Sequence, residues 1–480
     1  MKTVFYYFGI RRQLKFHPFR KAVAVFAGII LGSALLQAQD VTGQWNGVLS
    51  VPGMNLRVVF NIEKSGEGYK STMDSPDQGV KGIAITTTTF DGSKLSLAIP
   101  ANGILYEGAF QTDSIAGTFK QAGQSFPLTL KRSSEKVKPI ARPQEPKPPF
   151  PYISEDVAFA NKTAGITLAG TLTMPSTGSN FTAVILITGS GAQDRNEEVF
   201  GHKPFLVIAD YLTRRGIAVL RYDDRGTAQS TGDFHTATSA DFATDAESAI
   251  AWLKTRREIN PNKIGLMGHS EGGVIAPMVA ARSNDVAFIV MLAGTGIRGD
   301  KLLLLQEELI YRVAGIPEEK LKEAVKINSK VFDRIVNTND AVSQQDITGF
   351  MASMKDDIAK VIPEGVTADD YIRQLAASLS SPWMQYFLRY DPAPALEKVK
   401  CPVWAVNGSK DLQVPAKENL TAIRKALEKG GNRQVTVKEY PGLNHLFQES
   451  ATGSPTEYGV IEQTFSPEVL KDLSEWLQGR

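Results

Sequence analysis

The chain has 480 residues, which exceeds one ordinary domain and predicts two globular units. Its hydrophobic content of 42% and charged content of 22% are typical of a soluble protein with a substantial core. The 53 Lys and Arg residues nearly balance the 51 Asp and Glu residues, so the formal net charge is only +2. With no dense basic cluster beyond the N-terminus, the sequence gives no support to nucleic-acid binding.

The N-terminus has the pattern of a signal peptide. Basic residues between Arg11 and Lys21 precede an apolar stretch at 22–36, and Ala38 is a small residue at a plausible cleavage point. The stretch is shorter than the ~20 residues that a membrane span needs, which favours a signal peptide at 1–38 over an anchor. We therefore expect an exported protein, periplasmic or secreted, without a stable membrane span after cleavage. Sec and twin-arginine export both stay open.

The single cysteine, Cys401, cannot form an internal disulfide. Export without disulfides suits a bacterial periplasm better than a eukaryotic secretory pathway. We expect Cys401 to be a small buried apolar residue.

Residues 39–133 predict an all-β domain, and residues 134–151 a linker. Alternating apolar segments such as 55–62, 94–99 and 126–130 are separated by Gly, Asn and Asp turns, as in an antiparallel barrel or sandwich. This part carries no catalytic pattern, and its role stays open. The linker is rich in proline among charged residues and should be extended and semi-rigid.

Residues 152–480 alternate between strands and helices, which predicts an α/β domain with a mostly parallel sheet and helices on both faces. The expected strands are 166–174, 183–188, 218–222, 263–267, 287–292, 402–406 and 435–439, and the expected helices include 241–256 and 467–478. The alternation of strands and helices stops after residue 292, where a long segment predicts consecutive helices, for example at 301–313 and 318–336. We expect a helical cap at about 298–395.

Residues 268–272 read Gly-His-Ser-Glu-Gly, a G-x-S-x-G pattern centred on Ser270. An apolar run precedes it, and a small-residue segment that reads as a buried helix follows it. Strand, sharp turn and helix is the arrangement that lifts a serine out of a sheet as a nucleophile, and the flanking glycines avoid collisions in the turn. The alternative is a chance match in a glycine-rich loop, which the flanking elements disfavour.

A serine nucleophile needs a base, and the base needs an acid to orient it. His445 follows the last expected strand in a loop, where the base belongs in the order Ser, acid, His. His269 adjoins the nucleophile, and its ring should point away from the hydroxyl. Asp411 comes directly after the 402–406 strand and is the expected acid, with Asp391 as the alternative.

The oxyanion donors are expected from two loops. One is the backbone N–H of Glu271, the residue after the nucleophile, and the other is that of Ser190 or Gly191, in the loop after the 183–188 strand. The Glu271 carboxylate itself should favour the start of a helix through the helix dipole, ahead of a substrate-orienting role. No metal-binding spacing or phosphate loop occurs, so no cofactor or metal is expected.

The charged segment 221–226, Arg-Tyr-Asp-Asp-Arg-Gly, also follows a strand. We expect these charges to brace neighbouring loops ahead of acting on substrate.

Together, segments 189–195, 268–273 and 442–445 make residues 152–480 resemble the α/β-hydrolase superfamily, and more narrowly exported bacterial carboxylesterases with an N-terminal β domain. The resemblance implies an α/β-hydrolase fold with a helical cap, and hydrolysis of short-chain carboxylic esters. One departure is Thr188, where many members have His before the oxyanion-loop glycine, which leaves the geometry of that loop open.

The resemblance implies that Ser270, Asp411 and His445 form the catalytic triad of a serine esterase acting on a small-molecule ester. One alternative is a serine peptidase of the prolyl-oligopeptidase type, although residues 39–133 are too few for the propeller those enzymes usually carry. The other is an envelope binding protein with an inactive hydrolase domain.

The physiological substrate and the oligomeric state are not readable from the sequence. The bulky residues near the end of the cap, Trp383, Met384, Tyr386 and Phe387, either close the acyl pocket or form the core of the cap itself.

Overall fold

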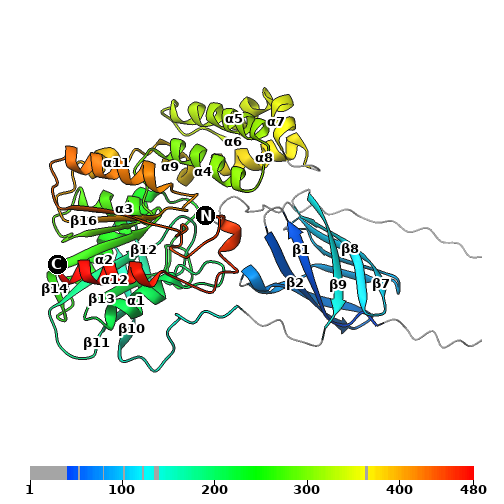
Figure 1. Ribbon diagram of the computed structural model, residues 1–480, viewed down its shortest axis with the longest axis horizontal. Coiled ribbons are helices and arrows are strands. Elements are labelled where there is room, and N and C mark those ends of the chain that lie inside the picture. The colour runs from blue at the N-terminus through cyan, green and yellow to red at the C-terminus, as the bar shows by residue number, and fades with distance from the viewer. Residues whose placement is uncertain are drawn as a thin grey trace, which may run out of the picture.

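The computed structural model describes residues 40–51, 54–78, 80–100, 103–121, 124–133, 140–362 and 366–480. The expected signal peptide and the first part of the linker lie outside these residues. Figure 1 shows an N-terminal β domain beside a larger α/β domain.

The β domain is one antiparallel sheet in which the first strand pairs with the last. Its strands are β1 (Gly43–Val51), β2 (Met54–Ser65), β3 (Gly68–Ser75), β4 (Val80–Ala84), β5 (Thr87–Phe90), β6 (Lys94–Ile99), β7 (Ile104–Gln111), β8 (Ser114–Gln121) and β9 (Gln124–Arg132). Their order is β4-β3-β2-β1-β9-β8-β7-β6-β5. Ser71 of β3 accepts the N–H of Ile85 at 3.0 Å and the hydroxyl of Thr88 at 2.9 Å, so the two ends of the sheet curl towards each other.

Alternation in sequence explains these strands. Along β6, Leu95, Leu97 and Ile99 are buried while the residues between them are not, as expected when successive side chains point to opposite faces. The inward residues pack around Trp45 and Tyr106. The buried Tyr106 hydroxyl donates to the Ile115 carbonyl at 2.8 Å, so this polar group is satisfied within the β domain.

The α/β domain is built on a second sheet, which agrees with the expected α/β-hydrolase fold. Its strands are β10 (Tyr152–Asn161), β11 (Ile166–Pro175), β12 (Phe181–Ile187), β13 (Ala218–Tyr222), β14 (Ile259–His269), β15 (Ile289–Leu292), β16 (Val403–Gly408) and β17 (Val435–Tyr440). The order is β10-β11-β13-β12-β14-β15-β16-β17, antiparallel at the β10 and β11 end and parallel from β13 onward. Only β10 has no counterpart among the strands that the sequence predicts.

Helices cover both faces of this sheet. One face packs on α1 (Pro204–Thr213) and α12 (Pro467–Gln478). The other packs on α2 (Ser239–Leu253), α3 (Gly272–Ala280) and α11 (Ala416–Lys429). The central strands are therefore buried on both sides, which is why they read as unbroken apolar runs instead of alternating ones.

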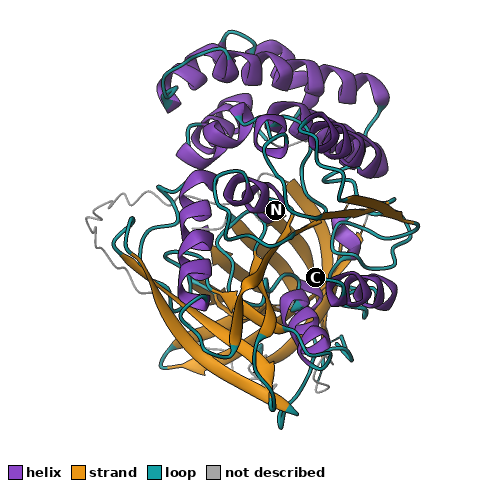
Figure 2. Ribbon diagram, turned by 90° about the vertical axis from the view of Figure 1, so that its left-hand side faces the viewer, coloured by secondary structure: helices purple, strands orange, loops and turns teal. Residues whose placement is uncertain are grey.

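A helical insertion lies between β15 and β16. It comprises α4 (Gly299–Val313), α5 (Glu318–Val336), α6 (Gln344–Ala352), α7 (Lys355–Val361), α8 (Ala368–Leu379), α9 (Pro382–Arg389) and α10 (Ala393–Leu396). Figures 1 and 2 show most of these helices as a layer on one side of the sheet. Within the described residues, no helix has both the length and the apolar character to cross a membrane.

The second half of the linker is held against the α/β domain. The Arg142 guanidinium donates to the carbonyls of Phe200 at 3.1 Å, Gly459 at 2.8 Å and Ile461 at 2.6 Å. The β domain reaches the same segment, because a Cβ on Gly459 would lie 1.8 Å from the Asp77 carbonyl oxygen in η1 (Pro76–Gln78). The linker is thus a bound strap along this part, and not a free spacer.

Candidate active site

Ser270 lies at the sharp turn between β14 and α3. Its φ of 53° is in the left-handed region, which is strained for a residue with a side chain. The strain is held by backbone bonds on both sides. The Ser270 N–H donates to the Leu292 carbonyl at 2.9 Å, and its carbonyl accepts the Gly273 N–H at 3.0 Å. This is the strand, turn and helix geometry that the motif predicts.

The glycines around Ser270 are required by close backbone packing. A Cβ on Gly268 would lie 1.8 Å from the Gly272 carbonyl oxygen, and a Cβ on Gly272 would lie 2.1 Å from that of Ile187. No side chain fits at such distances. The glycines of the motif therefore serve the turn itself.

Asp411 and His445 lie together at the carboxyl end of the sheet. His445 Nδ1 is 2.8 Å from Asp411 Oδ2, and both side chains are buried. The other carboxylate oxygen accepts the N–H groups of Gln413 and Val414, both at 2.8 Å. This arrangement fixes the carboxylate and directs Nδ1–H of the imidazole towards it, which leaves Nε2 as the basic nitrogen. Asp391, the alternative acid, is exposed and bonds to the Ala393 N–H.

Burial lowers the pKa of His445 below the ordinary histidine value of 6.5, although Asp411 opposes that effect. A neutral imidazole at neutral pH is the form that can accept a proton. Within the described residues the Ser270 hydroxyl makes no hydrogen bond, so the structure pairs His445 with Asp411 but does not pair it with Ser270.

The loop after β12 presents free donors beside Ser270. Gly189 is excluded as an oxyanion donor, because its N–H donates to Glu197 Oε1 at 2.7 Å. Across the described part of the chain, the N–H groups of Ser190, Gly191 and Glu271 donate to no protein acceptor. Of the two loop candidates, Ser190 lines the cavity at Ser270.

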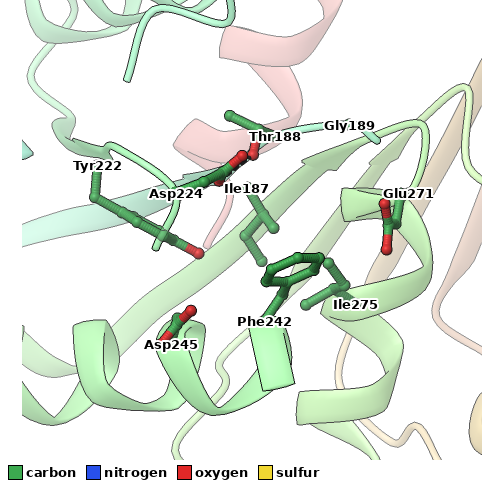
Figure 3. Close-up of a pocket in the computed structure, with 9 residues that line it drawn as sticks. All are labelled: Ile187, Thr188, Gly189, Tyr222, Asp224, Phe242, Asp245, Glu271 and Ile275. Carbon is green, nitrogen blue, oxygen red and sulfur yellow. Dashed lines mark hydrogen bonds between the residues drawn. The ribbon is translucent and has the colours of Figure 1, made fainter. Parts of the chain in front are cut away.

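Asp224 holds both ends of this loop. Its Oδ1 accepts the Thr188 hydroxyl at 2.6 Å and its Oδ2 accepts the Gln193 N–H at 2.9 Å. Figure 3 shows Thr188 and Asp224 side by side at the end of β12. Burial raises the pKa of Asp224 well above its usual range. Thr188 is thus bonded through its hydroxyl, which explains how the loop keeps its shape without histidine at that position.

Glu271 occupies the N-cap position of α3, at the helix start where its charge is expected. Its side chain makes no cap bond, and its Oε1 accepts the Ser239 hydroxyl at 2.5 Å and the Trp383 indole N–H at 2.7 Å. Burial raises the pKa of this carboxyl group. The bond to Trp383 joins α9 of the insertion to the residue beside the nucleophile, so the insertion is fastened over the site.

A small cavity of about 20 Å³ adjoins Ser270. Its lining residues are Ser190, Ser270, Glu271, Thr295, Leu302, Gln306, Trp383, Phe387, Gln413 and Val414. Of the four bulky residues singled out from the sequence, Trp383 and Phe387 line it and stack at 5.2 Å between ring centroids, whereas Met384 and Tyr386 do not line it. Both readings of these residues therefore hold in part, since Trp383 and Phe387 also belong to the core.

The charged segment 221–226 braces loops, as expected. Asp223 bonds to Arg195 at 2.7 Å, and Arg225 to Asp245 at 2.8 Å. Within the described residues, no group of His, Cys, Asp and Glu side chains has the arrangement of a metal site.

Sequence reasoning missed Glu197, whose Oε1 lies 2.9 Å from His269 Nδ1. It also missed Gln413 and Ser239, which contact the site through the bonds described above. Residues that face the same side of one helix or strand recur at a regular spacing, which is visible in the sequence. The contacts of these three residues join segments that are far apart in the chain, so no such spacing marks them. The one available hint was position, since Glu197 follows the oxyanion loop directly.

The chain is similar in sequence to known proteins. The sequence model of the X-Pro dipeptidyl-peptidase (S15) family matches residues 139–439, more than half of the chain. Esterase EstD of Thermotoga maritima is 24% identical over 313 residues, which cover 65% of this chain and 65% of EstD. The match thus spans slightly less than two thirds of that relative.

Other similar proteins cover smaller parts or are more remote. The uncharacterized protein YfhR of Escherichia coli strain K12 is 31% identical over 125 residues, covering 26% of this chain and 41% of YfhR. An esterase structure from Pyrococcus furiosus aligns with a TM-score of 0.43 at 15% identity, covering 68% of this chain and 91% of that one.

Proposed function

The chain belongs to the X-Pro dipeptidyl-peptidase (S15) family, whose model covers most of its α/β domain, and within this family we propose that it acts as a serine carboxylesterase on short acyl chains. Hydrolase chemistry follows from the family and the fold. The ester specificity and the residues that perform the reaction are the proposal. The observation that carries it is the buried Asp411–His445 pair at 2.8 Å, at the same end of the sheet as the strained Ser270.

In the proposed mechanism, Ser270 Oγ attacks the ester carbonyl carbon while His445 Nε2 takes its proton. Asp411 keeps Nδ1 protonated and stabilises the imidazolium that forms. The tetrahedral intermediate collapses, the alcohol leaves with the proton from His445, and an acyl-enzyme remains. Water, deprotonated by His445, then attacks the acyl group and releases the acid and free Ser270.

The negative oxygen of the intermediate would be met by the N–H groups of Glu271 and of Ser190 or Gly191. These donors have no competing protein acceptor in the described residues. Donors that are held in place before the charge develops give oxyanion stabilisation on the order of several kcal/mol.

The cavity at Ser270 supports a short acyl chain. At about 20 Å³, and with Trp383 and Phe387 on its wall, it holds about one water molecule, so an acyl chain must displace side chains and a short chain displaces the fewest. The similarity to EstD, which is named as an esterase, is a second support for ester substrates.

The family match favours a second candidate function, removal of X-Pro dipeptides from peptides. Such a substrate brings a free ammonium group, and Glu271 is a buried carboxylate on the wall of the cavity. Its Oε1 is occupied by Ser239 and Trp383, which weighs against this reading.

A direct test compares two substrates on the purified protein. Fluorophosphonate labelling of the wild type, but not of Ser270→Ala, is the expected result for a serine hydrolase. Faster turnover of p-nitrophenyl acetate than of Ala-Pro-p-nitroanilide supports the esterase. The reverse order would assign the protein to dipeptidyl cleavage, and absence of labelling would leave only a binding role.

We also propose export, based on the basic and apolar pattern of residues 1–38. Expression of the full chain in a bacterium should release a mature protein that begins near Gln39. Recovery of an uncleaved N-terminus would contradict this.

A further inference from the structure

His269, next to the nucleophile, is buried and has an acceptor at each ring nitrogen. Nδ1 is 2.9 Å from Glu197 Oε1, and Nε2 is 2.9 Å from the backbone carbonyl oxygen of His445. A carbonyl oxygen can only accept, so Nε2 must carry a hydrogen. With a carboxylate at the other nitrogen, the ring is satisfied at both positions only when it shares a second proton with Glu197.

Glu197 links this ring to the oxyanion loop. Its Oε1 also accepts the Gly189 N–H at 2.7 Å, and its side chain is 4% exposed. The backbone of Glu197 has a φ of 53°, a strained value for glutamate, which indicates that its carboxylate is required where it lies. One carboxylate therefore ties the loop of the oxyanion donors to the turn of the nucleophile.

His269 in turn holds the loop of the base. Its ring centroid is 4.8 Å from that of His445, and its Nε2–H bond fixes the His445 carbonyl. Asn444 supports the same loop by accepting the N–H groups of Leu446 and Gln448, both at 3.0 Å. His445 is thus held at two points. Asp411 bonds to its imidazole, and His269 bonds to its backbone carbonyl.

We propose that Glu197 and His269 form a buried imidazolium–carboxylate pair that positions the catalytic base and the oxyanion loop together. Neither residue touches the reacting atoms, so both are positioning residues. The proposal rests on the proposed function, because it assigns His445 as the base. In this proposal, His269 holds the loop of His445, a role that its position next to Ser270 in the sequence does not indicate.

The pair has an electrostatic consequence for His445. The titratable groups that face His269 are Glu197 on the oxyanion-loop side, with Asp411 and His445 on the loops after β16 and β17. Burial alone would lower the pKa of His269, but Glu197 outweighs it and the pKa is raised. The positive ring adds to the burial that lowers the pKa of His445. Removing that charge should move the acid limb of kcat/KM to higher pH.

The first test observes the ring directly and needs no activity. The sample is the full chain with ¹⁵N-labelled histidine and the substitution Ser270→Ala. The His269 signals are assigned by their loss in His269→Gln. They should show hydrogen on both ring nitrogens at pH 8. A neutral His269 that titrates near pH 6.5 would overturn the proposal.

The second test measures pH profiles with p-nitrophenyl acetate for Glu197→Gln, His269→Gln and the double variant. We expect kcat to fall by up to about a hundredfold with little change in KM, since small misplacement of the base has that effect. The acid limb should move to higher pH in all three variants. Because the two residues act as a unit, the double variant should lose no more than the worse single one.

Glu198→Gln is the matched control, since Glu198 is the exposed neighbouring carboxylate. It should keep the wild-type profile. Losses of kcat without any movement of the acid limb would reduce the pair to a structural role and refute the positioning proposal. Failure of the wild type to hydrolyse any ester would refute the proposed function instead, and the NMR measurement would still decide the state of the pair.

Discussion

At the residue scale, the proposed chemistry depends on three side chains from three separate loops. Asp411 is the least obvious of them, because carboxylates are frequent on loops. Its two carboxylate oxygens have different partners, the His445 ring on one side and the N–H groups of Gln413 and Val414 on the other. An asparagine would keep the size of the side chain, but its amide NH₂ would donate where one carboxylate oxygen of Asp411 accepts.

Asp411→Asn should therefore fold normally and lose up to roughly 10⁴-fold in kcat, because the amide favours the wrong imidazole tautomer. Asp391→Asn is the control and should stay near wild type, since Asp391 is exposed and accepts the Ala393 backbone N–H. Ester hydrolysis followed by circular dichroism of each variant measures both points. A collapse in Asp391→Asn with normal Asp411→Asn would reverse the assignment.

The acid limb of kcat/KM should lie below pH 6.5 in the wild type. In the proposed mechanism His445 works as a neutral base, and burial lowers its pKa from the ordinary value of 6.5, so the neutral form persists to lower pH. Activity is then retained at pH 6.5 and lost only as the pH falls further. A plot of kcat/KM between pH 4 and 8 measures the limb, and a midpoint above 6.5 would contradict this reading.

At the element scale, the turn between β14 and α3 is set by steric limits and not by side-chain bonds. Gly272→Ala would place a Cβ 2.1 Å from the Ile187 carbonyl oxygen, which forces backbone movement at the nucleophile. We expect a loss of about 1–3 kcal/mol in the free energy of unfolding, together with most of the activity.

The matched control is Gly349→Ala in α6, where a Cβ would meet nothing within 4 Å. It should be neutral or stabilising by up to about 1 kcal/mol, because alanine favours a helix. Urea unfolding monitors both variants. Equal effects at the two positions would show that the close approach at Gly272 is not limiting.

The insertion supplies part of the wall of the cavity at Ser270 through α9 and α4. In a series of p-nitrophenyl esters, activity should rise over the first few carbons, by up to about 0.8 kcal/mol per buried methylene, and then fall once the chain meets Trp383 and Phe387. We expect the optimum between acetate and hexanoate.

Phe387→Ala should move this optimum to longer chains, because it enlarges the cavity without removing the Trp383–Glu271 bond. Tyr386→Ala on the same helix does not line the cavity and should leave the optimum unchanged. Wild-type rates that still climb at decanoate would refute a closed pocket and indicate a lipase.

At the scale of the whole molecule, the two domains meet on the segment between η3 (Pro455–Glu457) and α12. Arg142 of the linker bonds to its carbonyls, and Asp77 of the β domain lies against Gly459. The same segment contains Tyr458, whose hydroxyl accepts from Gln413 at 2.9 Å on the wall of the cavity. Through this segment, the β domain and the linker thus support Gln413, which lines the cavity at Ser270.

Arg142→Ala should destabilise the α/β domain by about 1–3 kcal/mol, because it leaves three carbonyl groups without their charged donor. Lys147→Ala is the control, since Lys147 is an exposed cation of the same linker. Thermal unfolding compares the two. If Arg142→Ala matched the control, the linker would be only a spacer, as its proline content alone suggests.

The sequence by itself determined most strands of the α/β domain and their order along the chain. Unbroken apolar runs mark strands covered on both faces, and alternation marks the β domain. The glycines around Ser270 mark a turn that admits no side chain. These signals are local, since they depend on periodicity and on sterics between neighbours in the chain, and so one sequence suffices to read them.

Only the tertiary structure decided which distant groups meet. Glu197 and His269 are 72 positions apart, Glu271 and Trp383 are 112 apart, and His269 and the His445 carbonyl are 176 apart. Such contacts leave no periodic trace, because each joins two segments that are far apart in the sequence and that only the fold brings together. For this reason the role of His269, the partners of Glu271 and the wall of the cavity could not be read before the fold placed them together.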